Sequence, residues 1–210
     1  MESAEVNKGL DRMLGLTDDV FAFAITLLVL DIVTPTIFGP ATNSSLAGAI
    51  TQEWQSFLGY VVSFWVIGMH WLEHHRIFRF IKGYDNGLLY INLLYLFFIV
   101  LIPFATRVLD NYESLQLAII IFAAVQIGAS LTNVFTWRYA TSNRRLVNMQ
   151  VSDQTISWYG IRGFVGPLIF AISMLLSFIQ PYIAIASWFV VAPAHMLLDR
   201  RQAKRFSENS

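Results

Sequence analysis

The feature that most constrains this chain is a series of apolar windows, each close to the length that an α-helix needs to cross a bilayer. Such a helix requires about 20 mostly apolar residues, because it rises ~1.5 Å per residue through about 30 Å of hydrocarbon. The candidate spans, six in all, are 14–33, 54–72, 88–106, 115–137, 161–179 and 182–198. The sequence therefore predicts an all-α integral membrane protein with one six-span membrane domain over residues 1–210.

The composition agrees with this class and narrows the chemistry. Hydrophobic residues make up 56% of the chain, charged residues only 13%, and the mean hydropathy is +0.55, whereas a soluble domain is about one quarter charged. There is no cysteine, which excludes disulfides, thiolate metal sites and a cysteine nucleophile. The first twelve residues mix acids and bases and lack the pattern of a cleaved signal peptide. Nothing in the sequence suggests nucleic-acid binding, and we expect no cofactor.

The basic residues predict the orientation. With six spans and a cytoplasmic N-terminus, 13 of the 14 lysines and arginines fall on the cytoplasmic side, and only Arg107 falls outside. Cytoplasmic loops of membrane proteins carry this excess of basic residues, and adding or removing one span would move many of them to the other side. We therefore expect both termini in the cytoplasm and a multi-pass membrane protein, with its basic groups against anionic lipid.

The first window carries carboxylates near both of its ends. Leu14 to Ile32 is 19 residues, or about 28 Å of helix at ~1.5 Å per residue. Asp31 would lie near one interface, whereas Asp18 and Asp19 lie about a turn inside the other, where ionisable groups usually face the bundle interior or a water-filled path. One stripe of this helix contains Asp19, Phe23, Thr26, Leu27 and Leu30. This stripe is a candidate pore lining.

Two plainer interpretations of the same residues remain open. Two acids in the first turn of a helix are favoured by the helix dipole, and Thr17 could be the N-cap of a helix that starts at Asp18. Phe23, Leu27 and Leu30 at helical spacing are more often core or lipid-facing residues than pore residues. Periodicity alone does not decide between these interpretations.

The second window ends in "MHWLEHHR", in which His70, Glu73 and His74 spell H-x-x-E-H. In inverted zinc proteases this spacing provides two histidine ligands and a glutamate that activates water. An intramembrane zinc metalloprotease is therefore the enzyme alternative, although a third ligand such as Glu113 is predicted on the opposite side of the membrane. The alternative is that His70 and His74 hydrogen-bond across helices to the acid pair of the first window. Asn92 and the other polar residues in the spans, Gln126 and Asn133, could form hydrogen bonds between helices in general.

At this point the residues resemble a known family. Arg12-x-x-x-Leu16-Thr17-Asp18, followed by "VFAFAITLLVLDI", "HWLEHHRIF" and "NLLYLFFIVLIPFAT", is similar to the prokaryotic branch of the transmembrane protein 175 family of potassium channels. The resemblance covers all six spans. The family signature is Arg-x-x-x-Phe-Ser-Asp, so Leu16 and Thr17 are mild departures that keep an apolar side chain and a hydroxyl.

The resemblance implies a passive potassium channel without a carbonyl filter. It implies a homotetramer in which the first helix of each subunit lines the pore, with an apolar constriction at Phe23, Leu27 and Leu30. K⁺ would be the permeant ion. Arg12 and Asp18 would buttress this helix through neighbouring helices. The candidate members of the structural and gating network are Arg12, Thr17, Asp18, His70, His74 and Asn92.

Phe23 stands where family members often have an aliphatic residue, so four rings around the axis would favour a closed or high-barrier state, since apolar constrictions can gate by dewetting. Thr26 would offer hydroxyl oxygens to a partly dehydrated monovalent cation, and Asp19 and Asp31 would raise the local cation concentration at the two mouths. A six-helix carrier or scaffold without a pore is the remaining alternative, although the paired half-repeats of many carriers are not evident.

Overall fold

The structure is a computed structural model that describes residues 2–30, 32, 36–37 and 39–208. Within these residues the elements are α1 (Glu2–Val29), α2 (Asn43–Gln52), α3 (Trp54–Phe78), α4 (Asn86–Asn111), α5 (Gln116–Thr141), η1 (Ser142–Arg144), α6 (Asp153–Arg162), α7 (Val165–Leu176), α8 (Pro181–Ser187), η2 (Trp188–Val190) and α9 (Val191–Glu208). The one β-bridge among them pairs Ile81 with Val147. The expectation of an all-helical chain is confirmed at this level.

Helix α1 is longer than the apolar window that predicted it. It begins at Glu2, well before Leu14, and continues to Val29. Thr17 therefore lies in the middle of the helix, where its side chain is fully buried and its hydroxyl donates to the Met13 carbonyl. The interpretation of Thr17 as an N-cap is wrong, because the polar residues that precede it continue the helix instead of ending it.

Prolines explain why the last two apolar windows are each divided into several helices. Proline has no N–H for the carbonyl four residues earlier, and its ring crowds that carbonyl. The residue four positions before Pro167 is Gly163, where α6 ends and α7 follows. The residue four positions before Pro193 is Phe189, which lies in η2. Pro103 has no such effect, and α4 runs through it without a break.

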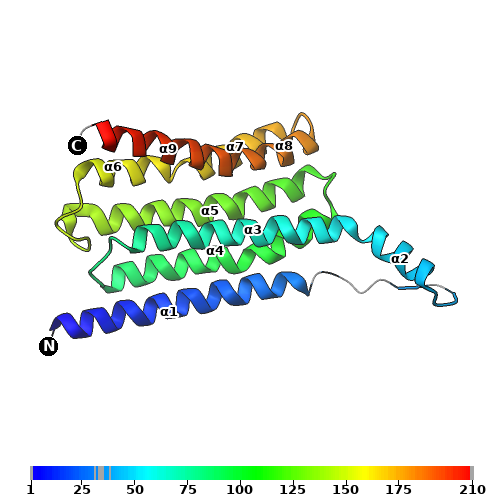
Figure 1. The fold of residues 1–210 in the computed structure, drawn as a ribbon, viewed down its shortest axis with the longest axis horizontal. Coiled ribbons are helices and arrows are strands. Elements are labelled where there is room, and N and C mark those ends of the chain that lie inside the picture. Colours follow the sequence, from blue (N-terminus) through cyan, green and yellow to red (C-terminus); the bar gives the residue numbers. More distant parts are fainter. Residues whose placement is uncertain (1, 31, 33–35, 38, 209–210) are drawn as a thin grey trace.

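Figure 1 shows the helices side by side along one axis. Helix α1 forms one edge and packs on α3 and α4, α4 packs on α5, and α5 packs on α7, which belongs to the layer of α6 to α9 at the opposite edge. The N-terminus and the C-terminus lie at the same end of the bundle. The short α2, within a connection for which no helix was expected, projects from the other end.

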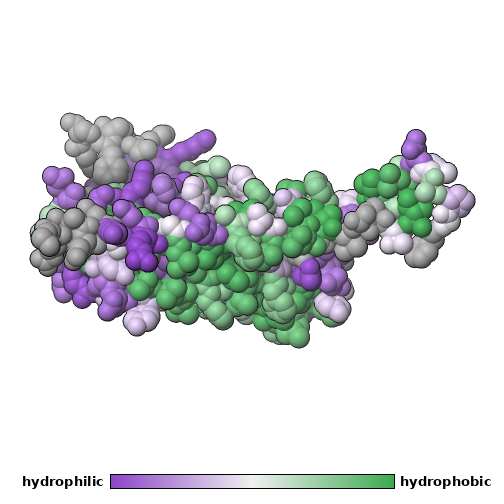
Figure 2. Space-filling model, turned by 90° about the horizontal axis from the view of Figure 1, so that it is seen from below, coloured by the Kyte–Doolittle hydropathy of each residue, from purple (hydrophilic) through white to green (hydrophobic). Residues whose placement is uncertain are grey.

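The surface divides into a polar end and an apolar band. Figure 2 shows hydrophilic residues gathered at the end that holds both termini and a broad hydrophobic band over the middle of the bundle. Among the described residues, four helical segments are long and apolar enough to cross a membrane: Asn86–Asn111, Gln116–Arg144, Asp153–Leu176 and Pro181–Gln202. Helices α1 and α3 are not among them, because acids and polar residues interrupt their apolar runs.

Candidate pore helix and its polar contacts

Helix α1 buries one face and leaves another uncovered. Phe21, Ala24 and Leu28 are each 2% exposed or less, whereas Phe23 is 61% and Leu30 is 69% exposed. The buried residues pack with α3, α4 and α5 in the main core cluster. The uncovered residues belong to the stripe that the sequence offered as a pore lining. Among the residues that the structure describes, no helix of the same chain covers this apolar face.

The other members of that stripe lie on the same side of α1. Asp19 and Thr26 are exposed and Leu27 is partly exposed. The Thr26 hydroxyl donates to the Phe23 carbonyl over 2.9 Å, so its hydrogen is used within the helix while its oxygen remains open to the outside. Asp31 lies outside the described residues.

A chain of hydrogen bonds joins α1, α4 and α3 at their buried faces. Asn92 Nδ2 donates to Thr17 Oγ1 over 2.8 Å, and Asn92 Oδ1 lies 2.9 Å from His74 Nε2. Because the amide oxygen only accepts, Nε2 of His74 carries the hydrogen. All three side chains are buried, and the imidazole stacks between Phe78 and Tyr95. The structure therefore brings together three of the six residues expected in the network.

Asp18 and His70 make contacts other than those that were expected. The indole Nε1 of Trp71 donates to Asp18 Oδ1 over 2.8 Å, so the partner of this carboxylate on α3 is a tryptophan and not a histidine. His70 Nε2 lies 2.7 Å from Gln126 Oε1 on α5. The expected bonds from His70 and His74 to the acid pair are thus wrong, because both rings face α4 and α5, whereas Asp18 lies on the exposed side of α1.

Arg12 stands apart from these contacts. It lies exposed on α1, and within the described part of the chain His70, His74 and Asn92 bond to other residues.

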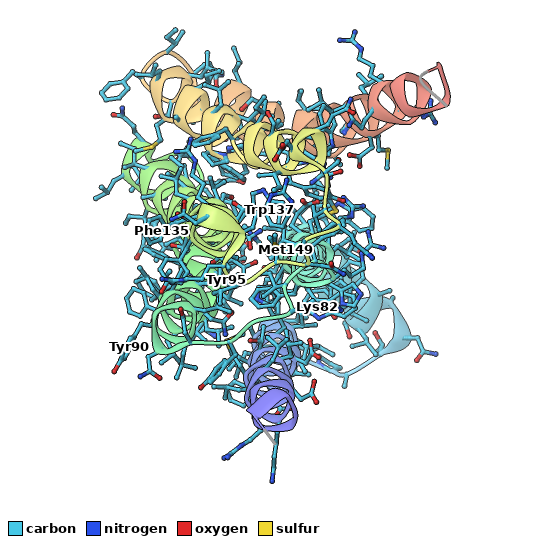
Figure 3. The ribbon with its side chains drawn as sticks, turned by 90° about the vertical axis from the view of Figure 1, so that its left-hand side faces the viewer. Lys82, Tyr90, Tyr95, Phe135, Trp137 and Met149 are labelled. Carbon is cyan, nitrogen blue, oxygen red and sulfur yellow. The ribbon has the colours of Figure 1, made fainter. Side chains whose placement is uncertain are left out.

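Tyr95 adds a further hydrogen bond between α4 and α3. Its hydroxyl donates to the His70 carbonyl over 2.9 Å, and Figure 3 shows its side chain on the inner side of α4.

A second polar cluster lies where α3, α6 and α9 meet. Arg162, only 2% exposed, donates from Nη1 and Nη2 to Glu73 and from Nε to Asp199 Oδ1 over 2.7 Å. Arg76 adds a 2.8 Å ion pair to Glu73. The sequence placed Arg162 only as a cytoplasmic charge. Its position at the edge of an apolar window was the available signal, because ionisable residues there usually face inward and are paired.

The zinc-protease spacing does not form a metal site in this structure. The imidazoles of His70 and His74 bond to amides on α5 and α4, while Glu73 pairs with arginines. No group of three or more metal-ligating side chains converges among the described residues. The three side chains instead connect α3 to three different neighbours.

These features define a multi-pass helical membrane protein whose first helix has a buried polar face and an uncovered apolar one. The family model described as endosomal/lysosomal potassium channel TMEM175 matches residues 12–103, and a potassium channel of Streptomyces collinus is 31% identical over 86% of this chain and 88% of its own. The chain belongs to the TMEM175 family of potassium channels, a class of transport proteins and not of enzymes.

Two further relatives extend the comparison. The crystal structure of a lysosomal potassium-selective channel TMEM175 homolog from Chamaesiphon minutus has a TM-score of 0.75 at 26% identity and covers 90% of this chain and 97% of its own. The human endosomal/lysosomal proton channel TMEM175 is 28% identical over 74% of this chain, which spans 32% of that longer protein. The likeness to the bacterial structure thus extends over nearly the whole chain.

Proposed function

We propose that this chain forms a passive potassium channel of the bacterial cell membrane, a homotetramer in which α1 of each subunit lines the path. The observation that carries the proposal is the uncovered face of α1, with Phe23 61% and Leu30 69% exposed beside a fully packed opposite face. Around a symmetry axis, four such faces meet one another instead of lipid. The names of the Streptomyces and Chamaesiphon relatives support potassium as the ion.

The narrow part of the path falls at Phe23, Leu27 and Leu30. A ring of apolar side chains resists hydration and therefore controls conduction by dewetting. Thr26 lies on the same stripe and offers a hydroxyl oxygen to the ion. Asp19 at the inner mouth and Asp31 at the outer mouth raise the local concentration of monovalent cations.

The topology that serves this pore has six crossings. The crossings are 14–33, 54–72, 88–106, 115–137, 161–179 and 182–198, with both termini in the cytoplasm. The common end of the two termini and the polar surface around it support this orientation. The contacts of Thr17, Asn92 and His74, and of Asp18 with Trp71, hold α1 against α3 and α4 and thereby fix which face it turns to the path.

The test is cation flux from liposomes that contain the purified protein, with opposed K⁺ and Na⁺ gradients. We expect passive K⁺ flux in the wild type and an increase in Phe23→Ile and Leu27→Ala, because both changes widen the apolar ring. Matched controls are Phe135→Ile and Leu131→Ala on α5, 55% and 42% exposed, where Figure 3 shows Phe135 pointing outward.

Equal changes in the α1 and α5 variants would rule out a path along α1. An absence of flux from folded, oligomeric protein in every variant would overturn the channel itself.

A further inference from the structure

A small polar pocket lies at the end of the bundle that holds both termini. It has a volume of about 280 Å³ and is formed by the α3–α4 connection, the α5–α6 connection and the start of α6. Two cations, Arg79 and Lys82, line it together with polar residues that include Asn148, Gln150 and Ser152. The volume is near the lower end for small-molecule sites, so a small anion or a headgroup fits, whereas a whole lipid does not.

The acidic residues around the pocket already have partners. Residues 79–85 and 142–153 together contain four basic and two acidic side chains. The two acids are Asp85, which pairs with Arg145 over 2.8 Å, and Asp153, which pairs with Arg144. Each acid therefore uses one arginine, and the other two basic residues are those of the pocket.

Arg79 and Lys82 have no counter-ion. Within the described part of the chain neither forms an ion pair, and the guanidinium of Arg79 instead lies over the ring of Phe80, with Cζ 5.8 Å from the ring centroid. Both side chains are exposed and line the same pocket. Two like charges beside one pocket repel each other, and an anion between them removes this repulsion.

Backbone hydrogen bonds hold the two connections against each other. The N–H of Lys82 donates to the Leu146 carbonyl over 2.7 Å, and the N–H of Asn148 donates to the Phe80 carbonyl over 3.2 Å. The two residues of the β-bridge in this region are buried. Figure 3 looks onto these connections, with Lys82 labelled on one and Met149 on the other. The pocket is thus positioned before a ligand arrives, which lowers the cost of binding.

The neutral groups of the pocket suit the oxygens of a phosphate. Asn148 Oδ1 accepts from the backbone N–H of Gln150 over 3.0 Å, whereas Asn148 Nδ2 makes no bond within the described residues and can donate to a ligand. A phosphate group can accept from a guanidinium, an ammonium and an amide at once, and arginine matches its geometry with two parallel bonds. A metal cation is disfavoured by the positive charge of the pocket.

We propose that this pocket binds the phosphate group of an anionic ligand between Arg79 and Lys82, with Asn148 as a neutral donor. The position of the pocket favours a lipid headgroup as the source, an argument that rests on the proposed topology. Phe78, the last residue of α3, lies six residues beyond Leu72, where the proposed crossing ends, or about 9 Å along the helix. The headgroup layer is about 5–8 Å thick, so the two cations lie within reach of lipid phosphates.

The experiment is native mass spectrometry of the full-length oligomer in a neutral detergent. It is titrated separately with dioleoylphosphatidylglycerol, with dioleoylphosphatidylethanolamine and with the soluble ester glycerol 3-phosphate. We expect phosphatidylglycerol to bind saturably and about tenfold more tightly than phosphatidylethanolamine, because the ammonium of the second lipid cancels the charge of its phosphate. Arg79→Gln combined with Lys82→Gln should weaken this binding about tenfold or more, since it removes two charge-assisted hydrogen bonds.

Matched controls separate this pocket from the general positive charge of the surface. Arg200→Gln combined with Arg201→Gln removes the same charge from exposed positions on α9 and should change binding less than about twofold. Gln150→Trp fills the pocket and keeps both cations, so it should weaken binding about fivefold or more. Met149→Trp, at the adjacent residue, should leave binding unchanged, because Met149 is 75% exposed and does not line the pocket. Elution as the wild-type oligomer shows that each variant folds.

The outcomes also identify the source of the phosphate. Binding of glycerol 3-phosphate alone, with the same dependence on Arg79, Lys82 and Gln150, would support the site and make its ligand a soluble phosphate ester. Equal binding of the two lipids, equal loss in the two charge-removing pairs, equal effects of the two tryptophan variants, or no binding of either phosphatidylglycerol or glycerol 3-phosphate would overturn the proposal. The readout is binding and not flux, and among the described residues none of α1 lines the pocket, so this result is separate from that for the pore.

Discussion

At the scale of single residues, Asn92 uses both ends of its amide to join three helices. Its nitrogen donates to Thr17 and its oxygen accepts from His74, all within the bundle. Asn92→Leu removes both bonds and leaves the buried Nε2–H of His74 without its acceptor, while Thr17 keeps only its bond to the Met13 carbonyl, so it should lower the free energy of unfolding by about 2 kcal/mol. Denaturation of the reconstituted protein measures the loss.

The matched control is Thr26→Val, whose hydroxyl bonds only to its own helix and which should change stability by less than about 0.5 kcal/mol. Thr17→Val combined with Asn92→Leu should cost less than the sum of the single changes, because the two residues share one bond. Strict additivity would show that the bond contributes nothing.

The sequence predicts which residues of this network are polar contacts between helices, but it does not predict their partners. Thr17, Asn92 and His74 were candidates because polar groups inside apolar windows usually find partners. Their pairing was not predictable, since it depends on how far each helix is rotated about its axis. The contact of Trp71 with Asp18 was not predictable either, because a tryptophan in an apolar run cannot be distinguished from a lipid-facing or core residue until the position of the neighbouring helix is known.

At the scale of the elements, Arg162 connects α6 to α3 and α9. Its side chain is 2% exposed, and its partners Glu73 and Asp199 are 18% and 43% exposed. Arg162→Gln removes the buried one of the two arginines that pair with Glu73 and leaves only the more exposed Arg76, so we expect a loss of about 3 kcal/mol in unfolding free energy. The C-terminal helix should also become more susceptible to protease, which limited proteolysis measures.

Arg145→Gln is the control, because that pair with Asp85 has a 54% exposed arginine and should contribute no more than about 1 kcal/mol. The addition of Glu73→Gln to Arg162→Gln should restore part of the loss. If the double variant were less stable than the single one, the account based on a carboxylate that loses its buried counter-charge would be wrong.

The contact between α4 and α5 requires a glycine at position 128. A Cβ added to Gly128 would overlap the ring of Phe98, whereas a Cβ on Gly68 of α3 would meet nothing within 4 Å. Gly128→Ala should therefore cost about 1–3 kcal/mol by overpacking, while Gly68→Ala should be neutral or slightly stabilising, since alanine is the better helix former. Thermal unfolding of the two variants distinguishes a tight interface from a loose one.

The helices themselves were predictable to different degrees. Helices α4 and α5 correspond to the windows 88–106 and 115–137, and each is longer than its window. They were predictable because a long apolar run without a competing signal favours a single helix. The breaks near Gly163 and Phe189 were not expected, since proline is tolerated in membrane helices and Pro103 interrupts nothing. The difference depends on whether neighbouring helices hold the freed carbonyl, which sequence does not display.

At the scale of the whole molecule, the bundle has a polar end and an apolar band, and the proposed orientation places the polar end in the cytoplasm. The absence of native cysteine makes this testable with single substitutions at exposed turns. Ser142→Cys, after α5, should react with a membrane-impermeant maleimide only from the cytoplasmic side, and Tyr112→Cys, after α4, only from the outside. Labelling of intact and opened spheroplasts measures both, and reaction of the two positions from one side would contradict the six crossings.

The polarity of α1 and α3 bears on how the protein is made. Apolar composition suffices to insert α4 and α5 into the bilayer. An acidic residue at the centre of a nascent helix costs about 2.5–3.5 kcal/mol on insertion, and α1 incurs part of this cost because Asp18 and Asp19 lie about a turn inside the interface. The groups that satisfy α1 are on later segments: Trp71 on α3 and Asn92 on α4. Before α4 is synthesised, α1 therefore lacks some of the polar contacts that stabilise it in the membrane. We expect α1 to settle only when α4 arrives, so the order of synthesis and the order of integration differ.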